Sequence, residues 1–172
     1  MNRQITLDAT IFAINSIHNK RFFHTERGYQ GALFCHLHQY FLEKGLITEE
    51  VILEMEYQKS TQHNVIQRPD IILHIPVEIS GADVHENNFA VWALKRESSS
   101  NKAREDFTKL DIMFGELNYP TGIFININSQ ETMLEEYKGN VKDRIYAFSI
   151  HREDNGLLIK MANFKKDNVI EQ

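Results

Sequence analysis

The sequence predicts an α/β fold in a single domain that spans residues 1–172. Segments with apolar residues at helical spacing alternate along the chain with short apolar runs that are typical of strands. A chain of 172 residues that is 42% hydrophobic can bury a sizeable core without disulfides. The only cysteine, Cys35, excludes an internal disulfide, and its apolar neighbours lead us to expect a buried thiol.

The chain is expected to begin with two helices, over 7–19 and 25–43. Thr25 is the candidate N-cap of the second helix, and Gly45 stands just after its end. Alternating side chains then predict a strand over 51–58, and the polar residues 60–67 predict a loop.

The middle of the chain contains two apolar strands that are separated by turn residues. Asp70 opens the first strand, over 71–75, and Pro76, Gly81 and Asn87-Asn88 mark turns within 76–88. The second strand, over 89–95, is apolar on both faces and therefore reads as a central strand of the sheet.

The rest of the chain predicts two helices and three strands. Phe107, Leu110 and Phe114 form an apolar stripe on a helix over 101–117. The remaining elements are a buried strand over 123–127, a short helix over 131–137, and a hairpin of strands 144–151 and 157–162 around Asp154-Asn155-Gly156.

Two charged residues at strand ends are candidates for a functional site. Successive strand residues point to opposite faces, so Ala93 and Lys95 share a face, and Lys95 is the first charge to break the run 89–95. If the strands after Asp70 and before Lys95 are neighbours, both side chains can meet at one point. Each residue also has a structural interpretation, since Asp70 can begin a strand and Lys95 can extend into solvent.

A carboxylate and a lysine at one point suit phosphodiester cleavage. This reaction uses a divalent metal that offsets phosphate charge and lowers the pKa of the attacking water. Magnesium binds hard oxygen ligands and usually takes one or two protein carboxylates, and a nearby lysine can orient the water. Asp70 and Lys95 supply two of these groups, but the side chain of Ala93 cannot bind a metal.

Arg68-Pro69-Asp70 and Ala93-Leu94-Lys95 resemble the motif of the PD-(D/E)XK nuclease superfamily over residues 22–128, in the order of the elements. The resemblance implies a restriction-endonuclease-like fold, in which helices flank a central mixed β-sheet. It also implies a magnesium-dependent endonuclease, with manganese as the alternative metal, that acts on DNA. Asp70 would be a metal ligand, Lys95 would orient the water, Glu26 would be the acidic residue of the helix, and position 93 would be the second metal ligand. Glu26 could equally be there only to stabilise the positive end of its helix.

Ala93 departs from this motif, and turnover should therefore be severely impaired. Either the protein is a natural degenerate member that binds nucleic acid or protein without cutting, or an alanine has replaced a glutamate to inactivate it. We favour the replacement, because glutamate at 93 would complete the motif with nothing else disturbed. Two further readings are a displaced acid, from Glu56 or Glu97, and a nuclease subunit that needs a protein partner.

The formal net charge of −5 argues against broad electrostatic adhesion to nucleic acid. Local charge differs, because Arg96, Lys102 and Arg104 follow the candidate site strand and could contact phosphates. His24 and His74 are weaker candidates for neighbours of the site. The absence of a signal peptide and of any membrane-length apolar run leads us to expect a cytoplasmic protein with no membrane contact, and a homodimer stays open.

Overall fold

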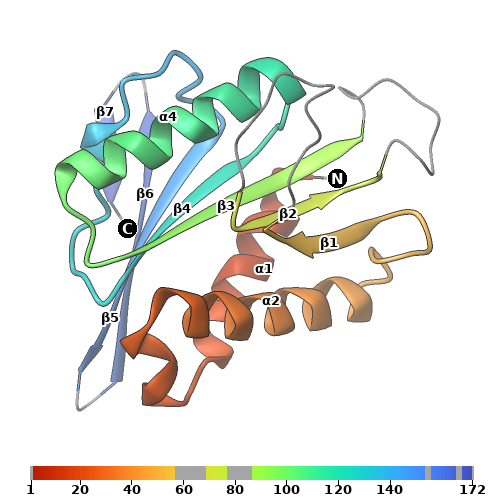
Figure 1. Ribbon diagram of the computed structural model, residues 1–172, viewed down its shortest axis with the longest axis horizontal. Helices are drawn as coiled ribbons and strands as arrows, with labels where there is room; N and C mark the ends of the chain where they lie inside the picture. The colour runs from red at the N-terminus through yellow and green to blue at the C-terminus, as the bar shows by residue number, and fades with distance from the viewer. Residues whose placement is uncertain (1, 57–68, 77–86, 154–155, 166–167, 172) are drawn as a thin grey trace.

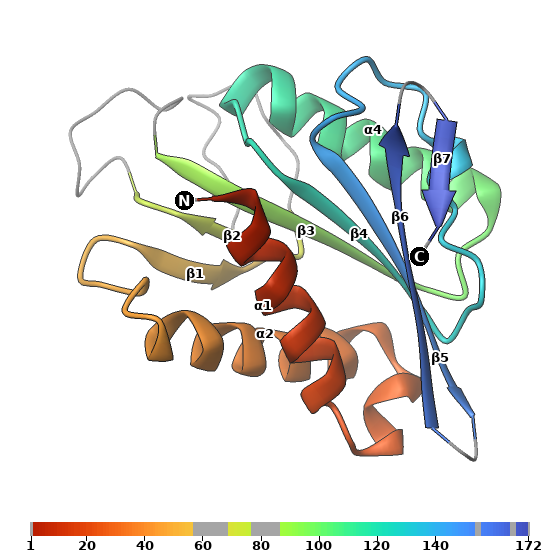
Figure 2. The ribbon, with the colours of Figure 1, turned by 180° about the vertical axis from the view of Figure 1, so that it is seen from behind.

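The computed structural model describes residues 2–56, 69–76, 87–153, 156–165 and 168–171. Their core is a seven-stranded sheet in which the strands lie in chain order. Helices α1 (Arg3–Ser16) and α2 (Glu26–Glu43) cover one face of the sheet, and α4 (Ser100–Leu117) covers the other (Figures 1 and 2). The seven strands are β1 (Ile52–Met55), β2 (Ile71–His74), β3 (Asn88–Arg96), β4 (Gly122–Ile127), β5 (Ile145–Glu153), β6 (Gly156–Lys165) and β7 (Asn168–Glu171).

The sheet is mixed. Neighbouring strands pair antiparallel from β1 to β3, parallel from β3 to β5, and antiparallel again from β5 to β7. Helix α4 connects the parallel strands β3 and β4, because parallel neighbours need a crossover. The predicted α/β class is therefore confirmed, and the strands that follow Asp70 and precede Lys95 are neighbours, as the sequence required for a shared site.

Strand β3 separates two apolar cores. Trp92 and Leu94 pack on the side of α1 and α2, whereas Val91 and Ala93 pack on the side of α4. The buried Trp92 is held in place by a hydrogen bond of 3.0 Å from its indole N–H to the Thr10 hydroxyl of α1. The central strand is thus fixed from both faces, and its end cannot shift freely relative to either helix layer.

Helix α2 begins where the sequence predicted. The Thr25 hydroxyl accepts a hydrogen bond of 3.1 Å from the Gly28 amide, which makes Thr25 the N-cap and places Glu26 in the first turn. After the helix, Gly45 has a φ of +66°, a left-handed conformation that glycine adopts without steric cost. The start of α2 is important below because Glu26 reaches the end of β3.

Some expectations were wrong. The segment 131–137 contains only the 3₁₀ turn η3 (Leu134–Glu136), the first helix runs from Arg3 to Ser16 rather than over 7–19, and β7 was not expected. Cys35 is exposed, because its position on α2 faces away from the sheet. The predicted loop 60–67, and the turn signals between 77 and 86, lie outside the described residues. Within the described ranges, no helix has both the length and the apolar composition that crossing a membrane requires.

Replacing Thr10 with valine should destabilise the fold. Valine keeps the shape of threonine but leaves the indole N–H of Trp92 without its acceptor, which should lower the free energy of unfolding by about 1–3 kcal/mol. Urea denaturation, followed by the fluorescence of this single tryptophan, measures the change. Thr10→Ser keeps the hydroxyl and is the matched control. Equal stabilities for the serine and valine variants would contradict the assigned role of the hydrogen bond.

Candidate active site

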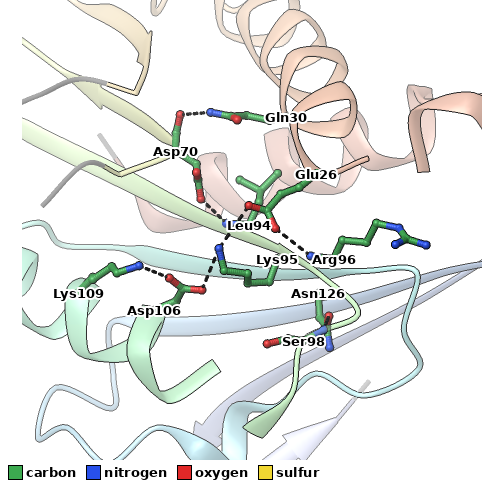
Figure 3. A network of polar contacts seen from close by, with 10 residues as sticks. All are labelled: Glu26, Gln30, Asp70, Leu94, Lys95, Arg96, Ser98, Asp106, Lys109 and Asn126. Atoms are coloured by element: carbon green, nitrogen blue, oxygen red, sulfur yellow. Dashed lines mark hydrogen bonds and ion pairs between the residues drawn. The ribbon is translucent and has the colours of Figure 1, made fainter. Parts of the chain in front are cut away.

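The candidate site lies at the carboxyl end of β3, where this strand extends past the start of β2. Side chains from both helix layers meet there, with Glu26 and Gln30 from α2 and Asp106 and Lys109 from α4 (Figure 3). Asp70, the residue just before β2, and Lys95, on β3, extend their side chains to the same point (Figure 3). The structure therefore brings together three of the predicted site residues, Glu26, Asp70 and Lys95, around position 93.

Asp70 is fixed by its backbone and by its carboxylate. Its carbonyl oxygen accepts a hydrogen bond of 2.8 Å from the Gln30 side chain, and its Oδ2 accepts one of 2.6 Å from the Leu94 amide. The last antiparallel pair of β2 and β3 joins Ile71 to Trp92, so the same register carried one residue further places Asp70 opposite Ala93. Side chains at directly opposite positions lie about 5 Å apart at Cβ, and position 93 is therefore within reach of the Asp70 carboxylate.

The Asp70 carboxyl group is electrostatically strained. Burial raises its pKa to about 6, although the hydrogen bond from the Leu94 amide acts in the opposite direction. The charges of Glu26 and Asp106 also contribute to this raised pKa, whereas the charge of Lys95 opposes them. A carboxylate in this state would gain from a nearby cation, because a positive charge favours its ionised form.

Lys95 is held between the two helix layers. Its Nζ lies 3.3 Å from Oε1 of Glu26 and 3.7 Å from Oδ2 of Asp106. Burial alone would lower the pKa of Lys95, but the negative charges of Asp106, Glu26 and Asp70 outweigh it and the pKa is raised. Lys95 therefore stays charged at neutral pH and cannot serve as a neutral base.

Glu26 contacts two consecutive residues of β3. While Oε1 accepts from Lys95, Oε2 accepts a hydrogen bond of 3.2 Å from the Arg96 amide. As Glu26 lies in the first turn of α2, its carboxylate also benefits from the positive end of the helix dipole. The start of α2 is thereby joined to the end of the central strand.

A small pocket opens beside Ala93. It has a volume of about 50 Å³, which is enough for more than one water-sized group. Ala93 shares its lining with the charged residues Asp70, Lys95, Asp106 and Lys109, and apolar residues close the remainder. The methyl group of Ala93 points to the same face as Lys95, so a longer side chain at 93 would enter the pocket between the charged groups.

Asp106 is a charged residue of the site that sequence reasoning missed. It is 4% exposed, its Oδ1 accepts a hydrogen bond of 2.7 Å from Lys109, and its Oδ2 has no hydrogen-bond partner among the described residues. The sequence did carry a signal, because Asp106 interrupts the buried stripe of α4 between Ala103 and Phe107. An acid on the apolar stripe of a helix is unusual and suggests a buried polar role.

Two further polar residues support the site. Gln30 likewise stands on the buried stripe of α2 and holds the backbone of Asp70. Asn126, which is fully buried on β4 next to Lys95, accepts a hydrogen bond of 2.9 Å from the Ser98 amide and fixes the connection from β3 to α4. Each is a polar residue inside an otherwise apolar segment, which is the pattern that could have found them.

The other predicted residues do not gather at this point. Arg96 points to the opposite face and donates to the Phe23 carbonyl at 3.2 Å, Lys102 is exposed on α4, and Arg104 is paired with Glu136 at 2.6 Å. The two acids considered as displaced ligands are engaged elsewhere, Glu56 with Arg27 and Glu97 with Arg96. His74 pairs with Glu54 at 2.6 Å near the other end of β2.

The donor set fits a magnesium ion only in part. Asp70 and Asp106 are hard oxygen donors on one pocket, and magnesium needs only one or two carboxylates. However, no three histidine, cysteine or acidic side chains of the described part of the chain lie close enough together to hold a metal ion. A carboxylate at 93 would add the donor that this arrangement lacks, opposite Asp70.

No known protein family, curated protein or solved structure matches the chain.

The raised pKa of Asp70 predicts a pH-dependent cost of keeping its carboxylate charged. The folded state binds this proton up to about pH 6, while the unfolded chain loses it near 3.8, so stability falls as the pH rises between these values. Asp70→Asn removes the charge but keeps an oxygen for the Leu94 amide. Relative to the parent, this variant should therefore gain up to about 3 kcal/mol of unfolding free energy between pH 4 and pH 7.

Urea denaturation at several pH values measures this difference. The control is Asp8→Asn, which removes an exposed carboxylate from α1 and should show little pH-dependent gain. A stability difference between Asp70→Asn and the parent that stays constant from pH 4 to pH 7 would show that Asp70 is not strained.

Proposed function

We propose that the protein is a metal-dependent endonuclease of the restriction-endonuclease-like fold, that it hydrolyses DNA phosphodiester bonds, and that Ala93 impairs it in the present form. One observation carries this proposal, namely that Asp70 and Lys95 line one small pocket together with Ala93. The mixed sheet with helices on both faces is compatible with the fold. The register that places position 93 opposite Asp70 gives a glutamate there a direct route to a shared metal.

Each residue has a distinct role in this proposal. A bound magnesium, or manganese as the alternative, would offset phosphate charge and lower the pKa of the attacking water. Asp70 would hold the metal through the oxygen that does not accept from Leu94. Lys95, which stays charged, would orient the water and stabilise negative charge on the phosphate. Glu26 would keep the Lys95 ammonium in position.

Asp106 supports Lys95 in this scheme and does not replace residue 93. Both of its carboxylate oxygens face lysines, Oδ1 toward Lys109 at 2.7 Å and Oδ2 toward Lys95 at 3.7 Å. Binding a metal through Asp106 would require breaking at least one of these ion pairs inside a buried site, which is costly. The second ligand is therefore assigned to position 93.

The second candidate function is a nucleic-acid-binding or protein-binding module without cleavage. It is favoured by Ala93 itself, and by the fact that Lys95 is already paired with two carboxylates, those of Glu26 and Asp106. In this case the charged cluster would be a structural remnant of a site that has lost its chemistry.

Ala93→Glu should restore metal-dependent cleavage. The new carboxylate would enter the pocket beside Asp70 and raise the rate of plasmid cleavage with magnesium or manganese by about 100-fold or more. Ala93→Gln has the same size without the charge and should stay inactive. The double variant Ala93→Glu with Asp70→Ala should lose the gain. Brisk magnesium-dependent cleavage by the parent would contradict the assigned role of position 93.

Metal binding can be tested without substrate. Magnesium that binds only the folded state raises the melting temperature, and the rise grows with metal concentration relative to Kd. We expect a larger rise for Ala93→Glu than for the parent or for Ala93→Gln, measured by thermal unfolding with and without magnesium. Equal shifts in all three would reject a metal site at position 93. If Ala93→Glu binds metal but cleaves neither plasmid nor single-stranded DNA, the protein is better explained as a binding module, or as a nuclease subunit that needs a partner.

A further inference from the structure

A second pocket lies on the opposite side of the sheet end from the candidate active site. Its volume is about 160 Å³, and it is lined by Lys20, Phe23, His24, Asn128 and Arg152. The first three belong to η1 (Lys20–His24), Asn128 follows β4, and Arg152 is near the end of β5, beside η1 in both ribbon views (Figures 1 and 2). Among the described residues, the lining contains basic side chains, an aromatic ring and an amide but no acidic side chain.

Arg152 is oriented in this pocket without being neutralised by an ion pair among the described residues. Its guanidinium carbon lies 5.7 Å from the centre of the Phe23 ring, a distance typical of a cation over an aromatic face. One Nη donates weakly, at 3.4 Å, to the carbonyl of Ile17, and the buried Nε has no hydrogen-bond partner within the described part of the chain. A buried N–H group normally has a hydrogen-bond acceptor. The described residues supply none for the Nε of Arg152.

The missing partner should be an anion that accepts several hydrogen bonds. Arginine presents its N–H groups as a planar fork that matches the oxygens of a phosphate, and stacking on an aromatic ring fixes the plane of that fork. Glu97, which accepts a hydrogen bond from Asn128 of the lining, is itself paired with Arg96 at 2.6 Å. Lys20 already has a polar interaction of its own. Arg152 is therefore the cation of the pocket to substitute in an experiment.

The pocket and the candidate active site share one short segment of chain. Phe23 and His24 line the pocket, whereas Glu26, two residues later, contacts Lys95. Arg96 joins the two sites, because its amide donates to Glu26 and its Nε donates to the carbonyl of Phe23. The two sites are therefore joined through Arg96 and the short segment from Phe23 to Glu26.

We infer that this pocket binds a backbone phosphate of the nucleic-acid substrate, next to the phosphate at the candidate active site. The inference rests on the proposed function for its substrate class and extends it to a second contact. Phosphate contacts position a nucleic acid without reading its sequence, so the pocket would set the path of the strand and not its sequence preference.

The test measures binding of labelled single-stranded and duplex DNA to the parent protein, which carries Ala93, by fluorescence anisotropy without magnesium. Arg152→Met removes the charge but keeps an apolar side chain on Phe23, and should weaken binding about tenfold. The slope of log K against log salt should also become shallower by about 0.7–0.9, the value for one phosphate contact. The matched control is Lys165→Met, which removes one exposed positive charge at the far end of β6 and should change affinity less than about twofold. Thermal unfolding confirms that both variants are folded.

The outcomes separate this inference from the proposed function. Unchanged affinity and salt slope in Arg152→Met, or equal losses in Arg152→Met and Lys165→Met, would overturn the phosphate pocket even if Ala93→Glu cleaves DNA. Absence of DNA binding by the parent at low salt would also overturn it. A selective loss in Arg152→Met, combined with an inactive Ala93→Glu, would support the pocket while rejecting the cleavage reaction.

Discussion

The hydrogen bond from the Leu94 amide to the Asp70 carboxylate is the contact on which the arrangement of the site depends. Strand β2 ends its ladder at Ile71, so the backbone of β3 beyond Trp92 loses its neighbour on that side. The Asp70 carboxylate satisfies the Leu94 amide instead, at 2.6 Å. One side chain thus extends the sheet by a residue, and it also brings a carboxylate opposite position 93. Without it, β3 would extend past β2 with an unsatisfied amide, and the pocket would lose the carboxylate that lies opposite position 93.

Lys95 connects the two helix layers because it stands at the end of the central strand, where neither core covers it. Glu26 reaches it from α2 and Asp106 reaches it from α4, so side chains of both layers meet at this ammonium group. The three acidic groups that surround it explain why it stays charged despite partial burial. The same arrangement fixes the starts of α2 and of the connection to α4, through Arg96 and Asn126. The position of Lys95 at the end of β3 therefore determines which side chains meet at the site and which charges surround them.

Much of this could be predicted from local pattern, and the remainder could not. The apolar run 89–95 indicated a central strand, and Thr25 marked the start of α2, because both depend on neighbouring residues alone. The pairing of β2 with β3 could be stated only as a condition for a shared site, since strand register depends on contacts between segments far apart in sequence. Asp106 and Arg152 were missed because their roles depend on which elements pack together, although Asp106 stood visibly on an apolar stripe. The predicted helix over 131–137 does not form, because tertiary contacts and not helical propensity hold the few apolar residues of this segment.

The energetic cost of the cluster is an argument for function over stability. Burial raises the pKa of Asp70 to about 6, and Asp106 keeps an oxygen without a hydrogen bond among the described residues. Apolar side chains of similar size at these positions would often serve stability as well or better, because buried ion pairs rarely recover the full cost of desolvation. Groups with such shifted pKa values concentrate at functional sites. In the function proposed above, this cluster with Ala93 beside its pocket would be a charged site from which one ligand has been removed while its supporting residues stay in place.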